Sequence, residues 1–132
     1  MVFLMSNDYE LSLILEKTGL TESGILDKLD VLVTTLGEKG SVIKTKGETF
    51  VIPAVKVEKP LDPTGAGDAY RAGFIKGISL GWPLPIAGRF ASVVAAYAVE
   101  VYGSQSQQYT LAEAYQRYKD NFGEELSSRP TR

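Results

Sequence analysis

The sequence predicts an α/β fold, in which a sheet of short strands is flanked by helices. Short apolar runs rich in β-branched residues alternate along the chain with longer segments of helical character. One run, residues 31–36, is nearly continuous in apolarity, which is typical of a strand covered on both faces. At 132 residues the chain is long enough to form one domain with its own core.

The first two elements are predicted from the residues that bound two apolar runs. Residues 2–5 form a short apolar run that stops at Ser6, which predicts a buried strand followed by a loop. The apolar residues between Glu10 and Lys17 predict a helix. Gly19 closes this helix, because glycine readily adopts the left-handed conformation that ends helices.

A short helix and a central strand come next. Thr21 is a suitable cap for a helix that ends near Lys28. Residues 31–36, with their β-branched side chains, predict a central parallel strand.

A hairpin follows the central strand. Residues 41–45 and 49–52 have strand character and flank the turn-forming stretch 46–48. The alternating residues 55–59 predict one further strand.

The second half of the chain predicts three helices. Residues 69–78 have helical character, and glycine and prolines at 81–85 interrupt the chain before a long, largely buried helix over 86–100. An amphipathic helix over 111–121 begins after Thr110, and a glutamate three residues later completes a capping-box spacing.

Composition narrows the possible chemistry. Fourteen Lys and Arg against sixteen Asp and Glu give a net charge of −2 with the signs interspersed, so no basic footprint for nucleic acid is present. Cysteine and histidine are absent, which leaves carboxylates, Lys or Tyr for acid–base chemistry. The apolar run at residues 2–5 is too short for a membrane span and lacks the basic residues of a signal peptide, so we expect a cytoplasmic protein with no membrane partner.

The segment 62–68, Asp-Pro-Thr-Gly-Ala-Gly-Asp, follows a predicted strand and precedes a predicted helix. Gly65 and Gly67 would place bare backbone N–H groups at a helix N-terminus, where they favour an anion such as a phosphoryl group. Asp68 would lie where the first helical turn begins and could accept a proton from an attacking hydroxyl. The alternative is a tight turn with Asp68 as an ordinary helix cap. The segment matches neither G-x-x-x-x-G-K-[ST] nor G-x-G-x-x-G.

The stretch 62–74, DPTGAGDAYRAGF, resembles the C-terminal signature of the ribokinase-like, or PfkB, carbohydrate kinase family. The resemblance implies that Asp68 is the base that activates the substrate hydroxyl. It also implies that Gly65, Ala66 and Gly67 form the anion hole for the transferred phosphoryl group, and that Thr64 contributes to the ATP site.

The fold implied by this resemblance is the C-terminal part of a ribokinase-like three-layer α/β/α sandwich. Its central sheet would be incomplete, with a β-hairpin and flanking helices. Residues 1–126 would form the nucleotide-binding and catalytic part, and residues 127–132 a frayed tail. Because full members of the family are more than twice as long, we expect the isolated chain to be weakly active or inactive. We also expect an exposed sheet edge through which a homodimer could form.

Two further segments match the family in the same order. Residues 7–10 resemble its N-x-x-E motif, which implies that Asn7 and Glu10 help to place magnesium through water. Taken alone, they favour a helix start with acidic residues in its first turn. The segment TLGEKG resembles the family's T-L-G-x-x-G loop, which implies that Thr35 and Gly37 face the nucleotide and that Gly40 makes the turn into the hairpin. Taken alone, this segment reads as a plain strand connection.

Weaker matches to the family concern the adenine pocket and a site for a monovalent cation. The resemblance places Ser92, Gly103 and Ser104 at the adenine pocket. It also implies a site for a monovalent cation such as K⁺, between Asp62 and backbone carbonyl groups of the loop near Ser104. The sequence SQSQ from Ser104 departs from the family pattern there.

The function implied is ATP-dependent phosphorylation of a hydroxymethyl group on a sugar or nucleoside, with an adenosine-like acceptor favoured by the GDAYRAG and GWPLP segments. An alternative is a catalytically inactive nucleotide-binding or regulatory domain that acts through a partner chain. Trp82, Tyr97 and Tyr102 are expected to pack rather than to stack on a base, and Arg71 to be solvated or structural.

Overall fold

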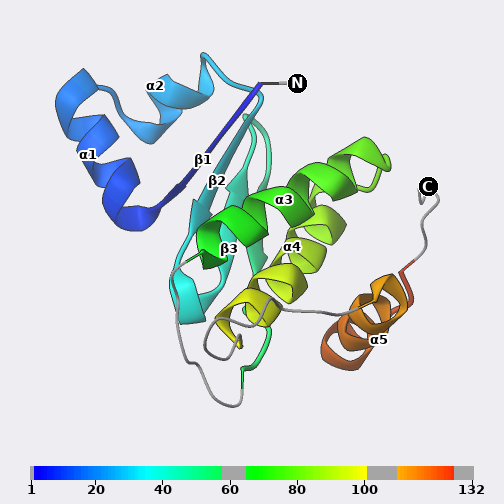
Figure 1. Cartoon of the computed structure of the whole chain (residues 1–132). Helices are drawn as coiled ribbons and strands as arrows, with labels where there is room; N and C mark the ends of the chain where they lie inside the picture. The colour runs from blue at the N-terminus through cyan, green and yellow to red at the C-terminus, as the bar shows by residue number, and fades with distance from the viewer. Residues whose placement is uncertain (1, 58–64, 101–109, 127–132) are drawn as a thin grey trace.

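The computed structural model describes residues 2–57, 65–100 and 110–126 (Figure 1). In chain order its elements are β1 (Phe3–Asn7), α1 (Asp8–Thr18), α2 (Glu22–Leu26), β2 (Val31–Thr35), the 3₁₀ turn η1 (Gly37–Lys39), β3 (Ser41–Lys44), β4 (Thr49–Ile52), α3 (Ala66–Ser79), α4 (Leu84–Val99) and α5 (Leu111–Phe122).

The described strands form one mixed sheet in the order β1-β2-β3-β4. β1 and β2 are parallel, and the register pairs Phe3 with Val31 and Asn7 with Thr35. β2 is antiparallel to β3, and β3 is antiparallel to β4, so the predicted hairpin is present. β2 lies inside the sheet as predicted, but it has a parallel neighbour on one side only.

Helices cover both faces of this sheet, which gives the three-layer α/β/α arrangement (Figure 1). On one face, Leu32 packs against Leu11 of α1 and Ile25 of α2. On the other face, Val33 packs in a cluster with Phe74 of α3 and with residues of α4. The alternation of side chains along β2 therefore supplies two separate cores.

A third cluster joins the helices on the second face. Trp82 and Phe90 pack edge-to-face with ring centroids 5.2 Å apart. Ala114 and Tyr118 bring α5 against this cluster, and Val55, which follows β4, is buried in it. The predicted packing role of Trp82 is confirmed, since its side chain is only 3% exposed.

Two predictions about strands require correction. β1 does not stop in a loop at Ser6: it continues to Asn7, because Asn7 caps α1 and the helix starts at the next residue. The strand predicted over 55–59 is wrong for residues 55–57, which form no strand; residues 58 and 59 lie outside the described residues. The alternation of Val55 and Val57 is satisfied by packing against α4 and α5 instead of by strand pairing.

The helix boundaries differ from the predictions at their starts. α3 begins at Ala66, three residues before the predicted start, because Gly65 serves as its cap and Gly67 is accommodated in the first turn. α4 begins at Leu84, since Pro85 fits the first turn of a helix, where its missing N–H is not needed. Within the described ranges, no helix has the length and apolar character needed to cross a bilayer.

Candidate active site

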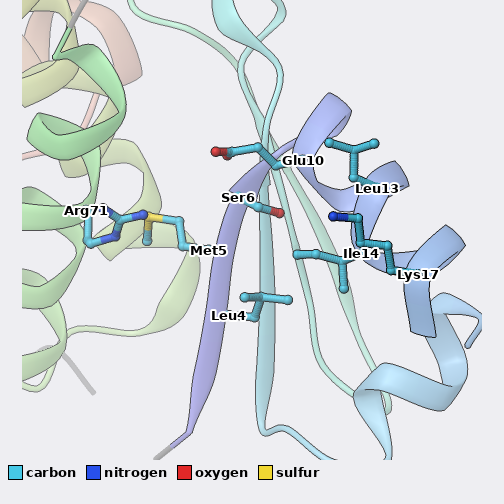
Figure 2. Close-up of a pocket in the computed structure, with 8 residues that line it drawn as sticks. All are labelled: Leu4, Met5, Ser6, Glu10, Leu13, Ile14, Lys17 and Arg71. Carbon is cyan, nitrogen blue, oxygen red and sulfur yellow. The ribbon is translucent and has the colours of Figure 1, made fainter.

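Three segments with predicted site residues lie around the carboxyl end of β1. Asn7 ends β1 and is register-paired with Thr35, which ends β2. Glu10 in the first turn of α1 and Arg71 in the second turn of α3 line one pocket, and Ser6 of β1 lies between them (Figure 2). The fold therefore gathers the N-x-x-E segment, the end of the central strand and the start of α3.

The start of α3 leaves backbone donors uncapped among the described residues. Gly65 is the cap residue, with a φ of 89°, and within the described residues no side chain makes a capping hydrogen bond to the start of this helix. The first intrahelical bond runs from the Ala69 N–H to the Gly65 carbonyl at 2.9 Å, so the N–H groups of Ala66, Gly67 and Asp68 have no acceptor within the helix. A Cβ atom added at Gly67 would meet nothing within 4 Å in the described structure, so no close packing at this position requires glycine.

Asp68 is the third residue of α3, so the interpretation of Asp68 as the helix cap is wrong. Its side chain is 87% exposed, and its Oδ1 accepts a hydrogen bond from Arg71 Nη1 at 3.1 Å. An ion pair this exposed contributes little to stability. Sequence reasoning missed it, although the spacing of three residues on a helix is a usable signal. The Asp68 carboxylate therefore remains accessible from solvent.

Asn7 and Glu10 form a complete capping box at the start of α1. Asn7 Oδ1 accepts from the Glu10 N–H at 2.6 Å, and Glu10 Oε1 accepts from the Asn7 N–H at 3.0 Å. The helix-start interpretation of this segment is therefore confirmed as a structural role. Within the described residues no three carboxylates gather as a metal site. A single exposed carboxylate fits magnesium held through water, because Mg²⁺ keeps most of its octahedral positions for water and phosphate oxygens.

The TLGEKG segment forms η1 and the turn into the hairpin. Thr35 Oγ1 lies 3.5 Å from the Ser6 carbonyl, across the β1–β2 pair. Gly37 has a φ of 62°. Gly40 has a φ of 99°, and a Cβ added there would collide with the carbonyl oxygen of Ile52. The predicted turn at Gly40 is confirmed, and the positive φ together with the close approach of the Ile52 carbonyl accounts for glycine at this position.

A buried hydrogen bond ties this turn to α3. Ser41, directly after Gly40, and Tyr70, two residues after Asp68, join their hydroxyl oxygens at 2.8 Å. Burial raises the pKa of Tyr70 to about 12, while the hydrogen bond with Ser41 acts in the opposite direction. Tyr70 is thus a neutral anchor for the helix that begins at the proposed anion hole. The two residues are 29 positions apart, and no pattern in the sequence links them.

The remaining predicted site residues either make structural contacts or lie outside the described residues. Ser92 is buried in α4, and its hydroxyl donates to the Gly88 carbonyl at 3.0 Å. The Arg117 guanidinium lies over the Tyr97 ring, 4.6 Å from its centroid, as expected of a packing aromatic. Four predicted site residues lie outside the described residues: Asp62, Thr64, Gly103 and Ser104. Tyr102 also lies outside them.

Comparison with known proteins finds matches over most of the chain. The family model described as pfkB family carbohydrate kinase matches residues 2–111. A nucleoside kinase of Methanocaldococcus jannaschii is 36% identical over 115 residues, which cover 87% of this chain and 38% of that protein. A nucleoside kinase of Methanothermobacter thermautotrophicus is 37% identical over 123 residues, which cover 92% of this chain and 39% of that protein.

Solved structures of related kinases also match most of this chain. Burkholderia thailandensis nucleoside kinase in complex with ADP-inosine superposes with a TM-score of 0.90 at 39% identity, covering 94% of this chain and 39% of that chain. Thermotoga maritima ribokinase superposes with a TM-score of 0.75 at 28% identity, covering 90% of this chain and 42% of that chain. The chain thus spans about two-fifths of the length of each of these relatives.

Proposed function

Because the chain belongs to the pfkB family of carbohydrate kinases, we propose that it carries the ATP-binding and catalytic part of a kinase that phosphorylates a nucleoside or sugar hydroxymethyl group. The observation that carries this proposal is the start of α3, where backbone donors without side-chain caps and an exposed carboxylate occur within four residues. Since the matches leave about three-fifths of the relatives' length uncovered, acceptor binding is assigned to a part outside this chain.

The chemistry proposed is in-line transfer of the ATP γ-phosphoryl group. Asp68 accepts the proton of the acceptor hydroxyl while the bond from that oxygen to Pγ forms and the bond from Pγ to the β–γ bridging oxygen breaks, leaving ADP. The N–H groups of Ala66 and Gly67 stabilise the charge on the transferred group, together with the dipole of α3. Gly65 directs these donors, because its left-handed backbone turns the chain into the helix.

Two cations are part of the proposal. Asn7 and Glu10 would hold magnesium through water, and the ion would neutralise charge on the ATP phosphates. Potassium is proposed at Asp62, on the family resemblance alone.

The ATP site also includes predicted contacts beyond α3. Thr35 and Gly37 are proposed to face the phosphates, a role supported by the register pairing of Thr35 with Asn7. Thr64, Ser92, Gly103 and Ser104 remain predicted contacts.

A nucleoside is the favoured acceptor. The similar kinases of Methanocaldococcus jannaschii and Burkholderia thailandensis are nucleoside kinases, and the latter has been solved with inosine. We propose a purine nucleoside for the family member to which this chain corresponds, with adenosine as the first candidate and inosine as the second. Ribose is the sugar to compare with them, since ribokinases are also among the relatives.

Calorimetric titration of the purified chain with magnesium-ATP, with and without potassium, tests the proposal. We expect saturable binding that requires magnesium, because the anion-binding start of α3 and Glu10 both belong to the described fold. No binding in either buffer would contradict the assignment of the ATP site to this chain. A second experiment fuses this chain to the part of a relative that it does not cover. If the chain binds ATP but the fusion shows no turnover, an inactive nucleotide-binding domain is favoured instead.

A further inference from the structure

A buried pair of hydroxyl groups joins α3 to the sheet. The Tyr70 and Ser41 hydroxyl oxygens lie 2.8 Å apart, and these residues are only 4% and 1% exposed. The Tyr70 ring belongs to an apolar cluster and stacks on Phe74 with ring centroids 6.4 Å apart. A Cβ atom added at Gly88 of α4 would lie 3.5 Å from the Tyr70 hydroxyl oxygen. Phenylalanine would fill such a site without the cost of burying a hydroxyl group, so packing alone does not account for tyrosine here.

On the sheet side, this hydroxyl pair is attached to the end of β2 and to the turn that follows it. Ser41 is the first residue of β3, and its register partner on β2 is Thr35. Paired residues of an antiparallel ladder place their side chains on the same face of the sheet. The turn between the two strands is closed by the Leu36 N–H, which donates to the Gly40 carbonyl at 2.8 Å. Ser41 is therefore fixed with respect to Thr35 and Gly37, the two residues proposed to face the ATP phosphates.

On the helix side, the hydroxyl pair holds the beginning of α3. Tyr70 lies in the second turn of this helix, two residues after Asp68 and five after Gly65. Farther along, α3 packs closely on α4, because a Cβ atom added at Gly73 would lie 3.0 Å from Ala91 Cα. Apolar contacts of this kind have no preferred direction, whereas a hydrogen bond fixes both a distance and an angle. The hydroxyl pair therefore sets where the first turns of α3 lie relative to the sheet.

We propose that Tyr70 is a positioning residue for the phosphoryl-transfer site and acts through its hydrogen bond with Ser41. The bond holds the start of α3, with Asp68, at the distance from the β2–β3 turn at which both contact the phosphates of one ATP. The inference rests on the proposed kinase function, and extends it to two buried residues that act through the segments they hold. Phosphoryl transfer depends on alignment of the reacting groups, so a displacement of about 1 Å on one side of the site can lower its rate about 10²-fold.

A positioning role and a purely structural role for the hydroxyl pair predict different results. Tyr70→Phe leaves the Ser41 hydroxyl buried without this partner, and should raise the unfolding equilibrium constant about tenfold. Adding Ser41→Ala replaces both polar groups by apolar ones and should restore most of that stability. A positioning role requires the hydrogen bond itself, so ATP binding should stay weakened in the double variant although its stability has returned.

Calorimetric titration with magnesium-ATP and denaturant unfolding, on the whole chain and its variants, test the proposal. We expect Tyr70→Phe and the double variant each to bind ATP about tenfold more weakly than the unchanged chain. Tyr118→Phe is the matched control, because Tyr118 of α5 is fully buried in a separate cluster and its hydroxyl donates to Glu124 Oε1 at 2.7 Å. This control should lose stability and bind ATP as the unchanged chain does.

The outcomes separate the positioning role from the kinase function. Equal ATP affinity in the unchanged chain and the double variant would overturn the positioning role and leave the kinase function standing. So would a fall in affinity that Tyr118→Phe shares, because such a loss would follow stability and not the contact with Ser41. If the unchanged chain shows no saturable ATP binding, the result counts against the proposed function, and the inference that rests on it is overturned as well.

Discussion

The starts of α1 and α3 carry similar residues, but they differ in which groups accept hydrogen bonds from their first backbone N–H groups. Each helix has an acidic residue at its third position, Glu10 in α1 and Asp68 in α3. In α1 the cap residue Asn7 and Glu10 exchange hydrogen bonds in a complete capping box. In α3 the cap residue is Gly65, no side chain of the described residues caps the helix, and Asp68 pairs with Arg71 at the surface.

This difference separates a helix start that serves stability from one that leaves room for a ligand. A capping box satisfies two backbone donors within the protein, so an anion gains little by binding to the backbone there. At the start of α3 the backbone donors lack such a cap among the described residues, and we propose that these donors and the positive end of the helix dipole bind an external anion. The following predictions test this distinction, from the largest expected effect to the smallest.

Asp68→Asn should have the largest effect, on turnover. In a fusion that supplies the part of Burkholderia thailandensis nucleoside kinase not covered by this chain, we expect turnover to fall about 10²–10⁴-fold with ATP affinity retained, because the amide cannot accept the hydroxyl proton. Steady-state kinetics measure it, and Asp120→Asn on α5 is the matched control. Equal turnover for Asp68→Asn and the unchanged fusion would remove Asp68 from the role of base.

Gly65→Ala should affect both stability and ATP binding. Alanine at a φ of 89° costs about 1–2 kcal/mol in free energy of unfolding and shifts the donors of α3. Gly19→Ala, at a φ of 71° and equally unobstructed, should lose similar stability but bind ATP normally. Denaturant unfolding and calorimetry compare the two. If both variants bind ATP alike, the start of α3 is not the anion site.

Glu10→Gln should separate capping from magnesium binding at α1. Glutamine preserves a capping box, so the stability should change little, while the loss of charge should weaken magnesium-dependent ATP binding about tenfold. Glu113→Gln makes the same change in the capping box of α5 and should alter neither quantity. ATP titrations across a range of magnesium concentrations measure the effect. An unchanged magnesium dependence would leave Glu10 with its capping role only.

Arg71→Gln should have the smallest effect, on stability. Since Arg71 and Asp68 are both well exposed, losing their pair should change the free energy of unfolding by less than about 0.5 kcal/mol. Lys119→Gln, whose pair with Glu125 is similarly exposed, is the control. Thermal or denaturant unfolding of both variants checks this. A loss well above that of the control would mean that Arg71 contributes to the packing of α3.

Much of the fold was predictable because its signals are local. The end of α1 at Gly19, the capping box of α5 and the hairpin between β3 and β4 depend on dihedral preferences and hydrogen bonds within a few residues. The three-layer architecture followed from the alternation of strands and helices together with the family resemblance. The strand predicted over 55–59 failed over 55–57 because alternating valines also suit a cluster of helices, and the sequence does not say which partner buries them.

For the candidate site, the sequence by itself determined which residue types are available and which helix start carries them. The glycines before Asp68, the asparagine and glutamate at the start of α1, and the absence of histidine and cysteine are all visible without coordinates. Only the tertiary structure decided that Asn7 and Thr35 end neighbouring strands, that Glu10 and Arg71 share one groove, and that Ser41 anchors Tyr70. Local patterns act through the backbone of a few residues. Contacts between distant segments are decided by the burial of apolar surface over the whole chain, which no short stretch of sequence records.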